Sequence, residues 1–178
     1  MPASTRAGWG WHCLAEQWAE RIVGDARIAR GDLVLDVGAG TGAVTEALTR
    51  VGARVIAVEL HPGRARYLRE RFAADRVTVV RADAGDLRLP RRPFKVVANP
   101  PFGVTTQLLH RLLVRHSQLV SAHLVLQQAA ARRWAGGRAP GAGRWARDYD
   151  VRVGRRVPRA AFSPPPAVDA SMLEIRRR

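Results

Sequence analysis

Short runs of β-branched and aliphatic residues alternate, over the first hundred residues, with stretches whose apolar positions recur at helical spacing. Four such runs are predicted as strands, at residues 33–37, 54–58, 77–81 and 95–98. The segments between the first three strands have helical periodicity. The first of these helices is expected to end at Gly52, and Pro62 stands where the second begins. This βαβ alternation predicts a sheet of parallel strands.

The remaining pattern extends the sheet and then weakens. A helix is predicted over residues 104–115, and an amphipathic helix over residues 14–23 precedes the first strand. The glycine- and arginine-rich residues 136–148 are expected to form a mobile loop. Three further strands are predicted, at residues 119–126, 149–157 and 171–178. The predicted fold class is therefore α/β, with a mostly parallel seven-stranded sheet, an antiparallel end, and helices on both faces.

Length and cysteine content limit the number of domains and the cellular compartment that we expect. The 178 residues have room for one domain with a proper core, and we expect that single domain to span residues 1–178. The only cysteine, Cys13, excludes an intramolecular disulfide and a cysteine-cluster metal site, and it indicates a reducing compartment. No signal-peptide core or membrane-spanning apolar run is present, so we expect a cytoplasmic protein without membrane contact.

Charge is distributed unevenly between the two halves of the chain. Residues 1–90 hold 13 basic and 11 acidic side chains, whereas residues 91–178 hold 17 and 4. Arginine provides all but one of the basic side chains, and its planar fork binds phosphate and stacks on bases. An arginine-biased genome would explain the preference for arginine over lysine but not the asymmetry. The charge therefore indicates a nucleic-acid partner.

A glycine-rich turn follows the first predicted strand. Asp36 ends this strand, and the glycines are spaced G-x-G-x-G, unlike the G-x-G-x-x-G of pyrophosphate-binding turns. Glycines let a ligand lie against the backbone, although nucleotide, flavin and purely structural turns share this feature. The three glycines are Gly38, Gly40 and Gly42.

Two more acidic residues end the next two strands. Glu59 stands where a carboxylate accepts both hydroxyls of a ribose, and Asp83 stands where the edge of an adenine would lie. Each acidic residue alone could be a helix cap or an arginine partner, but their joint occurrence at strand ends favours a ligand with a ribose and no phosphate. S-adenosylmethionine (SAM) is the expected cofactor, and the pattern calls for no metal.

The motif Asn-Pro-Pro-Phe at residues 99–102 follows the fourth strand on the same sheet edge. An exocyclic amine on a ring is a poor nucleophile because its lone pair is delocalised. If the side-chain oxygen of Asn99 and the carbonyl of Pro100 each accept one N–H, the lone pair turns toward the methyl group, and Phe102 would stack on the base. The alternatives are a rigid turn in which the asparagine caps the following helix, or a related enzyme acting on a cytosine amine or a protein glutamine.

Together with the late motif at residues 162–169, these elements resemble the ribosomal RNA adenine-N6 methyltransferases of the KsgA and erythromycin-resistance (Erm) families, more closely Erm. The resemblance implies a Rossmann-like SAM-dependent methyltransferase fold, with Phe162 as a second aromatic wall for the base. For Erm it implies methylation of an adenine N6 in 23S ribosomal RNA, naked or pre-ribosomal, by a monomer, and resistance to macrolide, lincosamide and streptogramin B antibiotics. The expected cofactor-binding residues are His12, Leu14, Asp36, Gly38, Ala39, Gly40, Gly42, Glu59, Leu60, Asp83, Ala84 and Asn99.

The chain departs from the family pattern in two places. Trp11 and His12 stand where the family has a Gln followed by Asn or His, which leaves a cofactor role for them open against plain packing. The helical C-terminal RNA-binding domain of the family is expected to be absent after Arg178. The alternative for the glycine-rich loop is a solvated connector. RNA contacts are otherwise expected from arginines in and beside this loop: Arg132, Arg133, Arg138, Arg144 and Arg147.

Alternatives of other kinds remain open at this point. The same chemistry could act on small-subunit ribosomal RNA or on adenine in DNA, while the basic second half disfavours a protein substrate. A non-catalytic RNA-binding assembly factor that keeps the cofactor fold is a further alternative. The intact glycine turn beside an intact Asn-Pro-Pro-Phe motif favours an enzyme.

Overall fold

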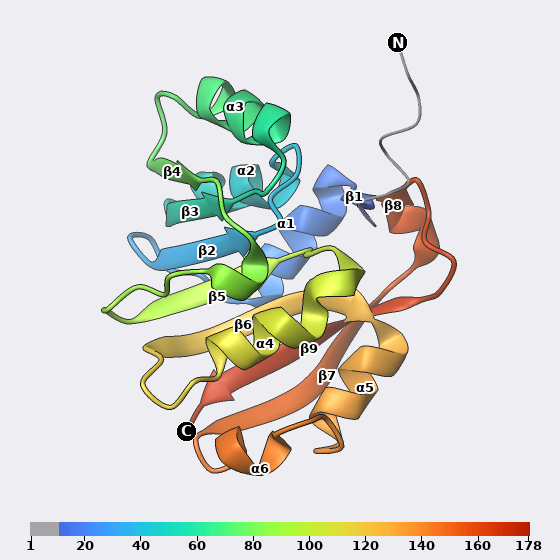
Figure 1. Ribbon diagram of the computed structural model, residues 1–178. Helices are drawn as coiled ribbons and strands as arrows, with labels where there is room; N and C mark the ends of the chain where they lie inside the picture. Colours follow the sequence, from blue (N-terminus) through green and yellow to red (C-terminus); the bar gives the residue numbers. More distant parts are fainter. Residues whose placement is uncertain (1–10) are drawn as a thin grey trace.

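A seven-stranded sheet forms the centre of the protein, whose computed structural model describes residues 11–178 (Figure 1). Five strands run parallel in the order β4-β3-β2-β5-β6, and β9 then pairs antiparallel with both β6 and β7. The fold class expected from the sequence is thereby confirmed. The strands of this sheet are β2 (Leu33–Val37), β3 (Arg54–Val58), β4 (Val77–Val80), β5 (Phe94–Ala98), β6 (Leu119–Gln127), β7 (Tyr149–Val157) and β9 (Ala170–Arg177).

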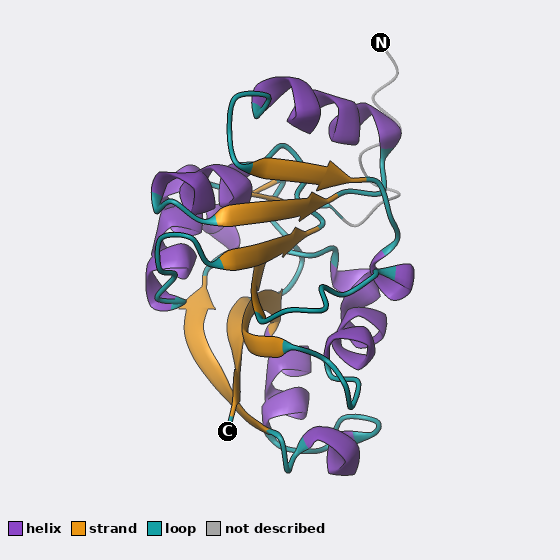
Figure 2. Ribbon diagram, turned by 90° about the vertical axis from the view of Figure 1, so that its left-hand side faces the viewer, coloured by secondary structure: helices purple, strands orange, loops and turns teal. Residues whose placement is uncertain are grey.

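Helices cover both faces of the sheet (Figure 2). One apolar layer contains α1 and α2, which also contact each other, and the opposite layer contains α4 and α5. The third helix packs beside the edge strand β4. The helices are α1 (Glu16–Asp25), α2 (Ala43–Arg50), α3 (Pro62–Arg71), α4 (Thr105–Leu112), α5 (Gln128–Ala135) and α6 (Ala142–Trp145).

Every strand of the large sheet ends within one residue of its predicted bounds. For the central strands β2, β5 and β6 the reason is burial, because strands covered on both faces are nearly continuous apolar runs with clear ends. In β2, for example, Val34 and Leu35 point to opposite faces and both are fully buried. The predicted helix start at Pro62 is also confirmed, with His61 as the N-cap.

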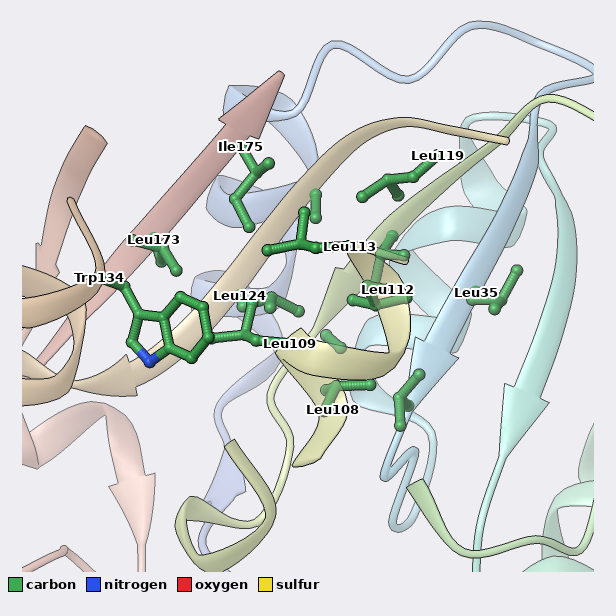
Figure 3. Packing of buried hydrophobic residues seen from close by; sticks show 14 of the residues in the cluster. Leu35, Leu108, Leu109, Leu112, Leu113, Leu119, Leu124, Trp134, Leu173 and Ile175 are labelled. Carbon is green, nitrogen blue, oxygen red and sulfur yellow. The ribbon is translucent and has the colours of Figure 1, made fainter. Parts of the chain in front are cut away.

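The larger core layer lies between α4 and the sheet. Leu108, Leu109 and Leu112 project from α4 and are fully buried, together with Leu124 of β6 and Trp134 of α5 (Figure 3). Their spacing of one, three and four residues puts the leucines on one side of the helix, and that side faces the strands. The helix thereby holds the residues that precede it, including Asn99, at a fixed place on the sheet edge.

Two sequence expectations were wrong. Leu14 does not begin the first helix but lies in a short strand, β1 (Cys13–Leu14), which pairs antiparallel with β8 (Phe162–Ser163). The expected mobile loop at residues 136–148 contains α6, whose Trp145 stacks on Trp134 with ring centroids 5.8 Å apart and planes 25° apart. Two large buried rings anchor this segment, a feature that its glycine and arginine content concealed.

Two further findings concern the described residues alone. Among residues 11–178, no helix has the length and apolar character that crossing a membrane requires. In the same range, no group of three or more histidine, cysteine, aspartate or glutamate side chains is arranged to hold a metal ion.

Replacing Trp145 by alanine should destabilise the fold by about 3 to 5 kcal/mol, the usual cost of truncating a buried tryptophan. Urea unfolding measures this change. The neighbouring Arg147 is exposed, and Arg147→Ala should shift stability by about 0.5 kcal/mol or less. Equal stability of the two variants would show that the stacked tryptophans do not anchor residues 136–148.

Candidate active site

The loops that follow β2, β3, β4 and β5 meet at one edge of the sheet, because these strands are parallel. The glycine turn lies there, between β2 and α2. Gly38 and Gly42 have φ angles of 76° and 95°, and a Cβ added to them would lie 2.7 Å from Pro101 and Phe72 respectively. Glycine at position 38 therefore lets the loop after β5 approach the turn, and glycine at position 42 lets α3 end against it.

Asp36 is the buried acidic group at the end of β2. Its Oδ2 accepts a 2.7 Å hydrogen bond from the hydroxyl of Thr45, whereas its Oδ1 is buried and has no hydrogen-bond partner among the described residues. Burial, and to a smaller extent the nearby Glu59 charge, raise the pKa of Asp36 to about 7, against the lowering effect of the Thr45 bonds. A buried acceptor without a partner is costly, and a cationic ligand group would satisfy it.

Glu59 ends β3 and is nearly saturated with donors. Its Oε2 accepts the amide of Gly40 at 2.9 Å, and its Oε1 accepts the amide of His61 at 2.8 Å and the guanidinium of Arg64 at 3.0 Å. Only 3% of the residue is exposed. The carboxylate thus ties the glycine turn to the start of α3 and leaves about one of its four acceptor positions open.

The loop after β4 carries the expected adenine-binding residues. Asp83 caps a short 3₁₀ helix, η2 (Ala84–Asp86), by accepting the amide of Gly85 at 2.7 Å. The residue borders a hollow of about 520 Å³, which Gln107 of α4 also lines. Ala84 is buried in the core, whereas Leu60 is 40% exposed. The hollow has the size of a ligand site.

Asn99 points its amide at the N-terminal segment. The Nδ2 group donates a 2.8 Å hydrogen bond to the carbonyl of His12, which leaves the side-chain oxygen as the group that is available to another partner. The helix α4 begins without a side-chain cap. The alternative in which Asn99 caps this helix is therefore excluded. The next residue of the loop, Pro100, is buried.

Three aromatic side chains gather beside Asn99. The Phe102 and Phe162 rings lie 6.5 Å apart between centroids and meet edge to face, with planes 74° apart. His12 contacts both, at 5.7 Å from Phe102 and 6.5 Å from Phe162, and its Nδ1 is 2.8 Å from the carbonyl of Pro164. The structure thus brings His12 to the aromatic pair. Phe162 is buried, and Phe102 is the half-buried member.

The remaining expected cofactor residues are structural neighbours of the turn. The amides of Gly38 and Ala39 both donate to the carbonyl of Val58, at 2.8 and 3.0 Å, and so hold β2 against β3. Leu14 is buried, pairs with Phe162 across the two short strands, and borders a small cavity with Asp36 and Asn99. These residues shape the site through packing and backbone contacts.

The five arginines expected to hold RNA lie on α5 and α6, in the turn between them and just after α6, away from the aromatic cluster. All five are exposed, and within residues 11–178 none has a side-chain hydrogen bond or ion pair. By contrast, Arg152, Arg155 and Arg156 of β7 are paired with Glu174, Asp25 and Asp169. These five guanidinium groups are therefore exposed and without an acidic partner among the described residues.

Sequence reasoning missed two contributors to the site. Thr45, on the first turn of α2, fixes one oxygen of Asp36, and Arg64 reaches Glu59 from the first turn of α3. Thr45 stands three residues after Gly42, and Arg64 stands two residues after Pro62, at the start of their helices. A polar residue at the start of the helix that follows a strand-end carboxylate was the sequence signal that could have identified both residues.

Comparison with known proteins identifies similar chains. Residues 14–178 match the family described as ribosomal RNA adenine dimethylase. The chain is 39% identical over 158 residues to a probable ribosomal RNA small subunit methyltransferase A of Natronomonas pharaonis, covering 83% of this chain and 56% of that protein. It is 39% identical over 147 residues to the mycinamicin-resistance protein MyrB of Micromonospora griseorubida, covering 82% and 47%.

A solved structure matches both fold and sequence. The crystal structure of the 23S rRNA methyltransferase ErmE superposes with a TM-score of 0.79 at 30% identity, covering 91% of this chain and 68% of that one. The chain spans about half the length of the curated relatives it matches.

The raised pKa of Asp36 gives a pH-dependent prediction for SAM, whose ammonium and sulfonium groups are cationic. Below a pKa of about 7 the carboxyl is neutral, and it must lose its proton to pair with a cation. SAM affinity should therefore rise with pH, by up to about tenfold per pH unit below pH 7, and level off above it. Calorimetry from pH 5.5 to 8.5 measures this profile. Asp36→Asn should flatten it, and an unchanged profile in that variant would exclude Asp36 as the titrating group.

Proposed function

The chain belongs to the ribosomal RNA adenine dimethylase family, and we propose that it transfers a methyl group from SAM to the exocyclic N6 amine of an adenine in 23S ribosomal RNA. The orientation of Asn99 carries this proposal. Its amide is committed to the His12 carbonyl, so its oxygen remains to accept an N–H from the base. The likeness to the 23S rRNA methyltransferase ErmE supports a 23S substrate, and the likeness to the mycinamicin-resistance protein MyrB supports antibiotic resistance, here to macrolides, as the consequence.

The proposed SAM site consists of groups that fit the parts of the cofactor. The unpartnered Oδ1 of Asp36 would accept the cationic methionine end, and Glu59 and the hollow beside Asp83 would take the ribose and the adenine. When bound, SAM supplies a sulfonium-activated methyl group. The residues expected to contact it, beyond those three, are Gly38, Gly40, Leu60, Ala84 and Asn99.

The proposed chemistry needs acceptors and positioning. The oxygens of Asn99 and Pro100 each accept one N–H of the adenine amine, which draws the nitrogen toward tetrahedral geometry. Its lone pair forms the new N–C bond as the C–S bond breaks, and the electron pair of that bond stays on sulfur. The product amine then loses a proton to solvent. Phe102 and Phe162 are proposed to hold the base, which must leave its stack to reach this loop.

The proposed RNA contacts lie outside the cofactor site. The five unpaired arginines in and beside α5 and α6 present positive charge that no acidic side chain of residues 11–178 pairs with. Phosphate contacts of this kind position an RNA without reading its sequence. We propose that this α5–α6 side holds the RNA backbone while the flipped adenine enters the loop at Asn99.

A small-subunit ribosomal RNA is the second candidate substrate. The relative from Natronomonas pharaonis carries a small-subunit name and is as similar in sequence as MyrB. The two candidates share one chemistry, so the residues at Asn99 do not distinguish them. A substrate comparison does.

Asn99→Ala should lower methyl transfer to 23S RNA by about two orders of magnitude or more, because one well-placed acceptor is lost in the transition state. SAM affinity should change little. Radioactive methyl transfer to naked 23S RNA, small-subunit RNA and duplex DNA, with calorimetry of SAM binding, measures both quantities.

The outcomes separate substrate from mechanism. Wild-type transfer to small-subunit RNA alone would replace the 23S assignment and leave the chemistry in place. Turnover of Asn99→Ala within a few fold of wild type would contradict the role of Asn99. Arg76 is exposed and directly precedes β4. The variant Arg76→Gln serves as a control and should act like wild type.

Replacing Arg133, Arg144 and Arg147 together by glutamine should weaken RNA binding and make it less sensitive to salt. Each phosphate contact contributes about 0.7 to 0.9 to the slope of log affinity against log salt, so three lost contacts reduce the slope by about 2. Filter binding over a salt series measures it. The matched control replaces the paired Arg152, Arg155 and Arg156, whose acidic partners already neutralise them. A larger effect from the control triple would contradict the proposed surface and indicate that the RNA binds at β7.

A further inference from the structure

Trp11 lies directly on the glycine turn. A Cβ added to Gly40 would be 2.5 Å from the indole Nε1 of Trp11, so the indole packs against the glycine backbone. With the indole in this position, the cavity between Trp11, Asp36, Gly38 and Asn99 measures about 20 Å³. A volume of that size holds about one water molecule, whereas ligand pockets measure about 300 to 1,000 Å³.

Arg64 connects the indole to the carboxylate that is proposed to bind the ribose. Its guanidinium carbon lies 5.1 Å from the centroid of the Trp11 ring, and its Nη2 is 3.0 Å from Glu59 Oε1. Glu59 Oε1 is thereby filled, since it also accepts the amide of His61. Two ribose hydroxyls could both bind Glu59 only after Arg64 has left it.

We propose that Trp11 and Arg64 form a cover over the ribose end of the cofactor site, and that SAM binds after this cover opens. The proposal rests on the proposed use of SAM and adds two residues that the family resemblance does not supply, since the family has glutamine at the position of Trp11. The cover has a weak point, because the buried Nε of Arg64 has no hydrogen-bond partner among the described residues. An unsatisfied donor favours opening.

The cover lowers the apparent affinity for SAM, because only the open fraction of the protein binds. Removing the indole removes both its packing on Gly40 and its contact with Arg64. Trp11→Gln should therefore bind SAM about fivefold more tightly than wild type, the upper range for a half-exposed cation–π pair. Arg64→Gln should act in the same direction, because it frees one acceptor position of Glu59.

The chain contains a matched control. Arg21 lies over Trp18 at 4.7 Å on α1, and neither residue borders the cavity at the glycine turn. Arg21→Gln removes a pair of the same kind and should leave SAM affinity unchanged. Melting curves of all variants verify that they are folded.

Two binding measurements, neither of which requires methyl transfer, test the proposed cover. Calorimetry gives the SAM affinity of wild type, Trp11→Gln, Arg64→Gln and Arg21→Gln. Tryptophan fluorescence should change when wild type binds SAM, because the indole leaves Gly40. Trp11→Gln should lose this change, whereas Trp18→Phe should keep it.

The possible results are distinct. Tighter binding by Trp11→Gln, with the fluorescence change assigned to Trp11, supports the cover. Equal or weaker binding by Trp11→Gln overturns it, and weaker binding would make Trp11 a direct contact of SAM. Absence of SAM binding in wild type and in every variant overturns the proposed function, and the cover with it.

Discussion

The site depends on one hydrogen bond between segments that are far apart in sequence. The Nδ2 of Asn99 donates to the carbonyl of His12 at 2.8 Å, and this bond joins the loop after β5 to the N-terminal segment. It fixes the side-chain nitrogen of Asn99 toward His12 and leaves the side-chain oxygen free to face another group. The pairing of β1 with β8 holds the same N-terminal segment and brings Phe162 beside it. If the bond were lost, the asparagine could rotate and present a donor where the proposed chemistry needs an acceptor.

The sequence predicted the sheet well and the contacts between its loops poorly. Strands buried on both faces are apolar runs with clear ends, and the glycines and carboxylates after them fall on one edge by topology alone. The positions of Asp36, Glu59 and Asn99 were therefore predictable. The contact of His12 with Phe102, and that of Trp11 with Gly40, join segments far apart along the chain, and no local periodicity encodes them. The same holds for Trp145, whose stacking on Trp134 requires the intervening turn.

Net charge alone says little about where an RNA would lie on this protein, because pairing removes much of it. Strand β7 is rich in arginine, yet Arg155 forms two hydrogen bonds with Asp25, and Arg152 and Arg156 each have an acidic partner. Such exposed pairs add little stability. They do reduce the attraction of the strand for phosphate. The five arginines in and beside α5 and α6 have no such acidic partner within residues 11–178, so their charge is not reduced by pairing.

The two carboxylates of the proposed cofactor site differ in a way that explains the different roles proposed for them. Glu59 has three donors from the turn and from α3, so its charge is already stabilised. Asp36 has only Thr45 as a side-chain partner, and both its burial and the charge of Glu59 favour its neutral form. A neutral hydroxyl would interact with either carboxylate, but only a cation relieves both the burial cost and the repulsion at Asp36. The electrostatics of this sheet edge therefore favour a cationic ligand, positioned between a saturated carboxylate and an unsaturated one.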